Sequence, residues 1–344
     1  MVNSFKLFKL ISINLIIIFS LIIFIEFSFK LYFEKKINCL YVLCDVEYIY
    51  NNNLYEPYDK VTYKRDKFGF RGRYKEVDKI DILVSGGSTT DERLLNLEDT
   101  WIEKLENNFL ENGNIKIDIV NAGIDGQSSF GHIWNFENWF KKIDNLSFKY
   151  IIFYVGLNES TEGSNFDLKS DNLSIYKKIK IFIKKNNGFV YRVFSIYQKY
   201  FTNKNINYGE NISNTNFILN ENILDDDDIA IKKVFLHNLH KLMELSKNFN
   251  AIPIFVSQRS SRWEKKGSLI YTMNNNNFYL KEKNLSNIMM NFCNSNDLIC
   301  VDLFTDLKLK REDTYDLMHL NPIGSNKVAN LIYQKIKDKI YIYN

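Results

Sequence analysis

Hydrophobic residues follow three different patterns along this chain, and the first is a long, mainly apolar run at Leu10–Phe29. Asn14 and Glu26 are its strongly polar members, and about 20 such residues suffice to cross the hydrocarbon core of a membrane. A buried core helix is disfavoured because no polar face interrupts the run. A cleaved signal peptide is disfavoured because the run is long and lacks a small-x-small cleavage site. We therefore expect a transmembrane anchor at residues 10–29, preceded by an N-terminal stub at residues 1–9.

The positive charges on either side of this run nearly balance, with Lys6 and Lys9 before it and Lys30, Lys35 and Lys36 after it. The charge bias that marks the cytoplasmic side of a membrane helix therefore does not decide the orientation. A short stub followed by a large C-terminal part fits an N-in signal anchor. We expect a single-pass membrane protein whose main domain lies outside the cytoplasm.

The second pattern consists of short apolar runs rich in Val, Ile and aromatic residues, which are typical of buried strands. There are five of them: Asp81–Ser85, Ile115–Val120, Tyr150–Val155, Ile252–Ser257 and Leu298–Leu303. The third pattern is the helical spacing of apolar residues between the strands, clearest at 231–245 and 328–336. Strands that alternate with helices predict a mostly parallel sheet covered by helices on both faces. Active sites of such folds lie beyond the C-terminal ends of the strands.

Two segments depart from this alternation. Residues 30–75 form a juxtamembrane stretch rich in Tyr, Asn and charge, which ends in the sequence FGFRG at 68–72. Residues 160–224 are too long for a plain connection, and we interpret them as an insertion over the active-site face or as a surface against the membrane. The acidic run Asp225–Asp228 is interpreted as the solvated start of a helix, not as a metal site. The main domain is expected at residues 76–344.

Composition narrows the possible functions. The 344 residues are 45% hydrophobic and 25% charged, which suits a globular protein, and 45 basic and 41 acidic residues are spread without a basic block. Nucleic acid is therefore not an expected partner. The four cysteines form no CxxC pair and have no suitably spaced His, so zinc has little support and no cofactor is expected. Cys39 and Cys44 are spaced for a small disulfide, although four unpaired thiols are an equally good interpretation.

Small-residue turns follow the first three predicted strands. They are Ser85–Thr90 (SGGSTT), Asn121–Gly126 (NAGIDG) and Gly156–Glu159 (GLNE). Such a turn can present the hydroxyl of Ser88, and Gly126 and Asn158 can offer a backbone and a side-chain N–H to an oxyanion. Each turn alone is weak evidence, because glycine and Asn are common in loops. In a parallel sheet, however, the three turns share one edge.

A fourth motif, Asp316–Gly324 (DLMHLNPIG), precedes the last helical segment. A serine hydroxyl needs an adjacent base to act as a nucleophile, and His319 is suited to that role. Asp316, three residues earlier, is suited to orient the imidazole and stabilise its cation. The other three histidines, His132, His237 and His240, fall in or near helical patterns and are expected to be structural.

Together, the order of these four motifs resembles the signature blocks of the SGNH/GDSL hydrolases, over roughly residues 78–340. The FGFRG stretch resembles the entry segment of their membrane-anchored bacterial members. The resemblance implies a flavodoxin-like three-layer αβα sandwich with a five-stranded parallel sheet. It also implies a Ser88, His319 and Asp316 triad, with an oxyanion hole formed by Ser88, Gly126 and Asn158.

Two positions depart from the family pattern: Gly87 replaces the Asp of Gly-Asp-Ser, and Glu159 replaces the Asp that follows the block-three Asn. Neither change removes an atom of the implied site, although Glu159 puts the position of the Asn158 loop in question. The resemblance implies ester hydrolysis through an acyl-serine, with an acylated envelope glycan or lipid as the expected substrate. The alternatives are an O-acyltransferase acting on a surface polysaccharide and a non-catalytic glycan-binding protein that retains the fold.

Overall fold

The computed structural model describes residues 2–33, 37, 39–159, 217–218, 227–266, 269–272 and 278–340. The predicted insertion at 160–224 therefore lies outside the described residues, apart from 217–218. The chain divides into two compact units, of which one comprises Met1–Tyr41 with Ser164–Asn205. The other comprises Val42–Gly163 with Ile206–Asn344 and holds the sheet and every motif singled out above. The two units are described separately below.

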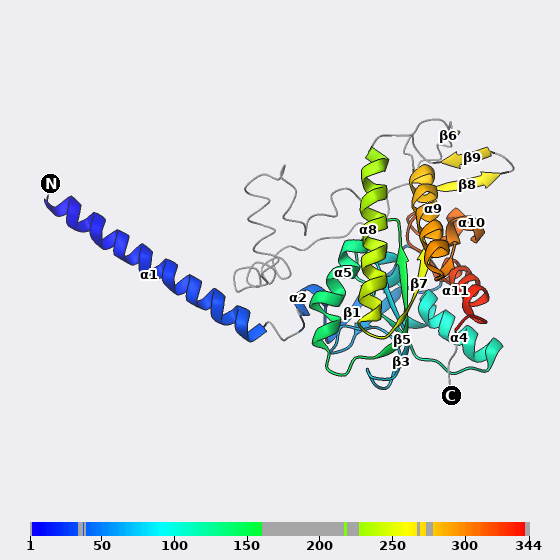
Figure 1. Ribbon diagram of the computed structural model, residues 1–344, viewed down its shortest axis with the longest axis horizontal. Helices are drawn as coiled ribbons and strands as arrows, with labels where there is room; N and C mark the ends of the chain where they lie inside the picture. The colour runs from blue at the N-terminus through cyan, green and yellow to red at the C-terminus, as the bar shows by residue number, and fades with distance from the viewer. Residues whose placement is uncertain are drawn as a thin grey trace. The chain divides into compact units, whose positions relative to one another are not determined.

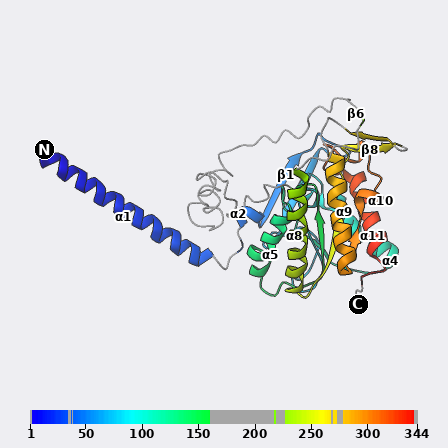
Figure 2. The same cartoon turned by 45° about the horizontal axis from the view of Figure 1, so that its top comes forward.

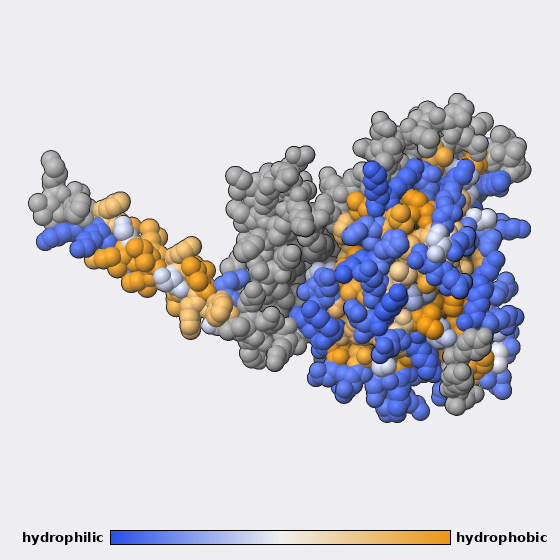
Figure 3. Space-filling model, in the orientation of Figure 1, coloured by the Kyte–Doolittle hydropathy of each residue, from blue (hydrophilic) through white to orange (hydrophobic). Residues whose placement is uncertain are grey.

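The first unit contains helix α1, which runs over Val2–Phe33 (Figure 1). Its segment Phe8–Ser28 is 21 residues long, apolar and unburied, so one described helix has the length and composition needed to cross a membrane. The apolar surface of this segment is visible in Figure 3. A signal sequence has the same properties, so the helix agrees with the predicted span at residues 10–29 without fixing its topology.

A five-stranded parallel sheet forms the centre of the second unit. Its strands are β3 (Ile80–Gly86), β4 (Ile119–Asn121), β5 (Phe148–Val155), β7 (Ile252–Ser257) and β10 (Ile299–Val301). Their order is β10-β7-β5-β3-β4, and every neighbouring pair is parallel. All five predicted strands are confirmed. β4 and β10 lie at the two edges of the sheet and are shorter than their apolar runs.

Alternate residues of these strands point to opposite faces of the sheet, and both faces are buried. Ile82, Ile152 and Ile254 pack in one core cluster with α4 (Trp101–Gly113) and α11 (Pro322–Ile336). On the opposite face lie α5 (Ser129–Asn138), α8 (Asp227–Lys247) and α9 (Phe278–Asn296), seen together in Figure 2. Aromatic pairs such as Phe136–Phe153 and Phe255–Phe292 join this second helical layer to the sheet. The expected three-layer αβα sandwich is confirmed.

Several smaller elements were not predicted. Strands β1 (Val46–Asn51) and β2 (Lys60–Arg65) form an antiparallel hairpin, and β6 (Phe217–Ile218), β9 (Leu269–Thr272) and β8 (Trp263–Lys266) form a small antiparallel sheet in that order. The short helices are α2 (Cys39–Val42), α3 (Ser88–Asp91) and α10 (Leu303–Asp306), with 3-10 turns at Leu97–Asp99, Phe140–Lys142 and Arg311–Asp313. The hairpin places part of the juxtamembrane stretch in the same compact unit as the sheet.

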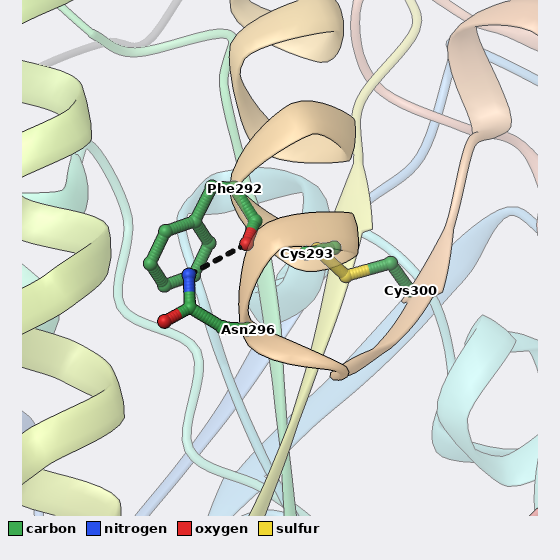
Figure 4. The surroundings of a disulfide bond; sticks show 4 residues. All are labelled: Phe292, Cys293, Asn296 and Cys300. Atoms are coloured by element: carbon green, nitrogen blue, oxygen red, sulfur yellow. Dashed lines mark hydrogen bonds between the residues drawn. A yellow bond between two sulfur atoms is a disulfide. The ribbon is translucent and has the colours of Figure 1, made fainter.

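None of the four cysteines is free in this structure. Cys293, near the end of α9, is bonded to Cys300 in β10, with 6.3 Å between their Cα atoms (Figure 4). Asn296 donates its side-chain amide to the carbonyl of Phe292 at 2.7 Å in the last turn of the same helix. Cys39 and Cys44 are also disulfide-bonded. Of the two interpretations left open by the sequence, the structure therefore contains disulfides and not free thiols.

Candidate active site

Ser88 stands at the start of α3, immediately beyond the C-terminal end of β3. The carbonyl of Gly87 accepts the backbone N–H groups of Thr90 and Asp91 at 3.0 and 2.9 Å, which closes the turn beneath the serine. A Cβ atom at Gly87 would lie 2.6 Å from Asn158 Nδ2 and 2.8 Å from the carbonyl oxygen of Gln127. Glycine at position 87 therefore allows the amide of Asn158 to approach the serine turn.

His319 lies between Ser88 and Asp316. Its Nε2 is 2.8 Å from Ser88 Oγ, and its Nδ1 is 2.5 Å from Asp316 Oδ2. The other carboxylate oxygen of Asp316 accepts the backbone N–H groups of Met318 and His319 at 3.1 and 2.7 Å. Leu317 has a φ of +71°, so the loop turns sharply enough for one carboxylate to bind both the backbone and the ring of the same histidine. The structure thus brings together all three residues predicted to form a triad.

The charge of Asp316 sets the tautomer of His319. Burial acts to raise the pKa of this carboxyl group, but hydrogen bonds from the His319 side chain and the two backbone N–H groups outweigh it, and the pKa lies below its ordinary value. The group is therefore an anion at neutral pH and accepts a hydrogen bond from the protonated Nδ1 of His319. This leaves His319 Nε2 as an acceptor facing the hydroxyl of Ser88, the arrangement in which an imidazole can act as a general base.

Neighbouring elements hold the loop that carries the histidine. The ring of Tyr315 stacks on that of His319 at a centroid distance of 5.6 Å and an interplanar angle of 12°. The backbone N–H of Ser261, beyond the end of β7, donates to the carbonyl of Leu317 at 2.9 Å. After the loop, Asn321 caps α11 by accepting two backbone N–H groups, and Pro322 occupies the first turn. Local capping therefore fixes where the helix begins and where the histidine loop ends.

The three predicted oxyanion donors belong to turns that follow β3, β4 and β5. Asn158 Nδ2 donates to the carbonyl of Gln127 at 3.0 Å, which joins the turn after β5 to the turn after β4. Gly126 has a φ of +73°, and a Cβ added there would meet nothing within 4 Å, so this glycine borders open space. The contact that a Cβ at Gly87 would make with Asn158 places the amide beside the serine turn.

Glu159 anchors the turn that carries Asn158. Its buried carboxyl group accepts the backbone N–H of Ser129 at 2.8 Å and the Ser129 hydroxyl at 2.7 Å. Ser129 Oγ also accepts the side-chain amide of Asn238 at 2.9 Å. Burial is the main influence on the carboxyl group and raises its pKa. The longer Glu side chain thus reaches the N-terminus of α5, where a negative charge is favoured by the helix dipole.

A buried ion pair beneath the serine turn was not anticipated from sequence. Arg65, the last residue of β2, contacts Asp91 of α3 at 2.6 Å, and Tyr63 donates its hydroxyl to the same carboxylate at 2.7 Å. Arg65 also donates to the carbonyls of Gly69, at 2.5 Å, and Gly123. Burial acts to raise the pKa of Asp91, but Arg65 and other neighbouring donors outweigh it and hold that pKa below its ordinary value. The hairpin therefore binds directly to the helix that carries Ser88.

Arg71, from the FGFRG segment, supports the same helix at its C-terminal end. Its guanidinium donates to the carbonyls of Asp91 and Glu92 at 2.8 Å each and to that of Leu95 at 2.5 Å. Its backbone N–H and carbonyl pair with Asn121, at the end of β4. The sequence signal that could have identified Arg65 was the alternation within β2, which points Val61, Tyr63 and Arg65 inward.

The remaining histidines, which were predicted to be structural, lie in α5 and α8. His132 is buried in α5, and its Nδ1 is 3.1 Å from Ser85 Oγ. Burial lowers the pKa of His132 to about 3, so it is neutral at physiological pH. His240 packs against Phe292 with a centroid distance of 4.8 Å. Among the described residues, no group of three or more His, Cys, Asp or Glu side chains is arranged to hold a metal ion.

Comparison with known proteins gives similarity to solved structures alone: no protein-family model matches this sequence, and no curated protein matches it. A GDSL-like lipase from Bacteroides thetaiotaomicron is 14% identical, with a TM-score of 0.41 over 76% of this chain and 90% of that chain. The psychrotrophic esterase EstA from Pseudoalteromonas sp. is 13% identical, with a TM-score of 0.42 over 75% and 97%. An acetyl xylan esterase from Geobacillus stearothermophilus is 11% identical, with a TM-score of 0.43 over 77% and 100%. The chemistry of the present site therefore has to follow from its own geometry.

Proposed function

We propose that this protein is a serine hydrolase that cleaves an ester through an acyl-serine intermediate. The observation that carries the proposal is the hydrogen-bonded series Ser88 Oγ, His319 Nε2, His319 Nδ1 and Asp316 Oδ2, with separations of 2.8 and 2.5 Å. A nucleophile, a base and a group that orients the base within hydrogen-bonding distance are the requirements for activating a serine. The position of the serine beyond the end of a parallel strand agrees with where such folds bind ligands.

In the acylation step, His319 Nε2 takes the proton of Ser88 while Oγ bonds to the ester carbonyl carbon. The carbonyl oxygen becomes an oxyanion, for which the backbone N–H groups of Ser88 and Gly126 and the side chain of Asn158 are the proposed donors. A donor of this kind contributes a factor of about 10²–10³ in rate. The carbon–oxygen bond to the leaving alcohol then breaks, and His319 returns its proton to that alcohol.

Deacylation repeats the sequence with a different nucleophile. Water gives a proton to His319 and bonds to the acyl carbon, and Ser88 leaves with a proton returned from the imidazolium. If a sugar hydroxyl replaces water, the same site performs O-acyl transfer to that sugar. In the proposal, hydrolysis is the reaction, and transfer is an outcome that product analysis distinguishes.

The proposed substrate is an acylated envelope glycan or lipid, and α1 is the proposed anchor that holds the domain at the membrane, outside the cytoplasm. A 21-residue segment of α1, Phe8–Ser28, with a mean hydropathy of 2.6, supports anchorage. An anchored ester hydrolase acts on molecules at the same surface, because tethering raises their effective concentration.

The test is labelling of the detergent-solubilised full-length protein with a fluorophosphonate, which reacts with activated serines. Labelling that disappears in both Ser88→Ala and His319→Ala is expected. A folded wild-type protein that is not labelled would favour the non-catalytic glycan-binding alternative. Incubation with an acetylated oligosaccharide and excess acceptor then separates hydrolysis, which releases acetate, from transfer, which acetylates the acceptor.

A further inference from the structure

Glu92 has a buried carboxyl group at the junction of three helices, and the reaction proposed above does not use it. The residue follows α3 directly and is 4% exposed. One carboxyl oxygen accepts the backbone N–H of Trp101, the first residue of α4, at 2.8 Å. The other oxygen is 2.7 Å from the hydroxyl of Ser325 in the first turn of α11.

These contacts join the two elements that hold the nucleophile and the base. The backbone N–H of Glu92 donates to the carbonyl of Ser88 at 2.9 Å. Ser325 donates its backbone N–H to the carbonyl of Asn321, two residues beyond His319, at 2.9 Å. A single side chain therefore connects the turn of Ser88 with the helix that follows His319, although 233 residues separate Glu92 from Ser325.

We propose that Glu92 is a positioning residue, whose carboxyl group fixes the separation of Ser88 and His319 by bridging α3, α4 and α11. The inference rests on the proposed serine chemistry and deepens it. Near-attack geometry is sensitive to small displacements, and a misplacement of about 1 Å from a distant mutation can reduce the rate about 10²-fold. Loss of the bridge is therefore expected to lower kcat and to leave KM nearly unchanged.

The environment of Glu92 adds a dependence on pH. Burial is the largest influence and raises the pKa of this carboxyl group to about 8, against the opposing effects of Ser325, the Trp101 N–H, Arg71 and Lys104. The hydroxyls of Tyr55 and Tyr154 also lie within its electrostatic reach. The group is therefore mainly protonated at neutral pH and ionises as the pH passes about 8. Ionisation puts a negative charge into the buried junction, so activity is expected to decline over that range.

The experiment compares wild type with Glu92→Ala and Glu92→Gln in the full-length protein. The measurements are kcat and KM for p-nitrophenyl acetate, and the rate of fluorophosphonate labelling, from pH 6 to pH 10. Glu92→Ala removes both hydrogen bonds and is expected to lower kcat about 10²-fold. Glu92→Gln keeps the shape and does not ionise, so it should retain near wild-type activity at pH 7 and lack the decline near pH 8.

Glu106→Gln is the matched control. The pKa of Glu106 is also raised by burial, to about 7, but its carboxyl group accepts the N–H of Ile119 at 3.0 Å, at the N-terminal end of β4 and away from the active-site edge. Its pH profile should match that of wild type. Thermal unfolding of each variant shows whether it is folded. If Glu92→Ala is not folded, the pH profile of Glu92→Gln tests the inference.

The inference is overturned if folded Glu92→Ala keeps the wild-type kcat, or if Glu92→Gln shows the same alkaline decline as wild type. Either result leaves the proposed function intact, provided that wild type is labelled by the fluorophosphonate. Absence of labelling in folded wild type overturns the proposed function itself, so the two failures are distinguishable.

Discussion

Asp316 shows how much a single carboxylate determines at the residue scale. One oxygen accepts hydrogen bonds from two backbone N–H groups of its own loop, and the other accepts one from Nδ1 of His319. The first interaction shapes the loop, and in the proposed mechanism the second selects the tautomer that leaves Nε2 free to accept the Ser88 proton. The loop geometry and the chemistry of the base can therefore be separated by a substitution that preserves one oxygen.

Asp316→Asn is such a substitution. Its amide oxygen can still accept the N–H groups of Met318 and His319, but its NH2 group donates to Nδ1 and stabilises the wrong tautomer. We expect kcat to fall by about 10⁴-fold, with a small change in KM and in thermal stability. Steady-state kinetics and a melting curve measure these effects, and a variant within tenfold of the wild-type kcat would contradict the assignment of Asp316.

Gly87 permits the second prediction at this scale, because a side chain there would meet the amide of Asn158 at 2.6 Å. Gly87→Ala is expected to displace that amide and lower kcat about 10²–10³-fold, as expected for loss of one oxyanion donor. Asn158→Ala should have a similar effect, and the double variant should be little worse than either single one. Additive losses in this double-mutant cycle would show that the two residues act independently.

At the scale of elements, the β1–β2 hairpin supports the helix that carries Ser88, in the proposed active site. Arg65 from β2 and Asp91 from α3 form an ion pair in which both side chains are 1% exposed. Arg71, from the segment after the hairpin, binds three carbonyls at the end of α3 and beyond it. A one-turn helix has few hydrogen bonds of its own, so these external donors hold it in place.

Removing Arg65 tests that support. Arg65→Met leaves Asp91 as a buried charge without its main partner, and it is expected to lower the free energy of unfolding by about 3–5 kcal/mol. Lys64→Ala is the control, because its ion pair with Glu47 is exposed (72% and 56%) and should contribute about 0–1 kcal/mol. Urea unfolding measures the free energy of unfolding of both variants. Equal losses would show that the buried ion pair contributes no more than the exposed one.

At the scale of the whole molecule, the retention or removal of α1 distinguishes two forms of the mature protein. As an anchor it remains attached, and as a signal sequence it is removed; the length and composition of Phe8–Ser28 suit either. We expect the protein to stay in the membrane fraction after alkaline carbonate treatment and to be released by detergent. Its intact mass should include residues 1–33, and a shorter chain in the soluble fraction would contradict anchorage.

The sequence predicted well those features that depend on local pattern. The apolar runs gave all five strands of the sheet, since a strand buried on both faces is apolar at nearly every position. The juxtamembrane stretch was harder to interpret, because many of its residues are Tyr, Asn or charged. The alternation of buried and exposed positions in β1 and β2 is therefore not a clear alternation of apolar and polar residues. The predicted insertion at 160–224 lies outside the described residues, so its role stays a prediction.

By itself, the sequence determined the five strands of a parallel sheet and the turns at one of its edges. It did not determine the order of the strands. It placed Ser88, Asn158, Asp316 and His319 in turns of that kind, because short motifs can be recognised in a sequence without knowledge of the fold. The tertiary structure decided that Ser88 and His319, 231 residues apart, meet at 2.8 Å, and that Glu92 reaches Ser325. Contacts of this kind depend on how sheet and helices pack, which no local stretch of sequence encodes.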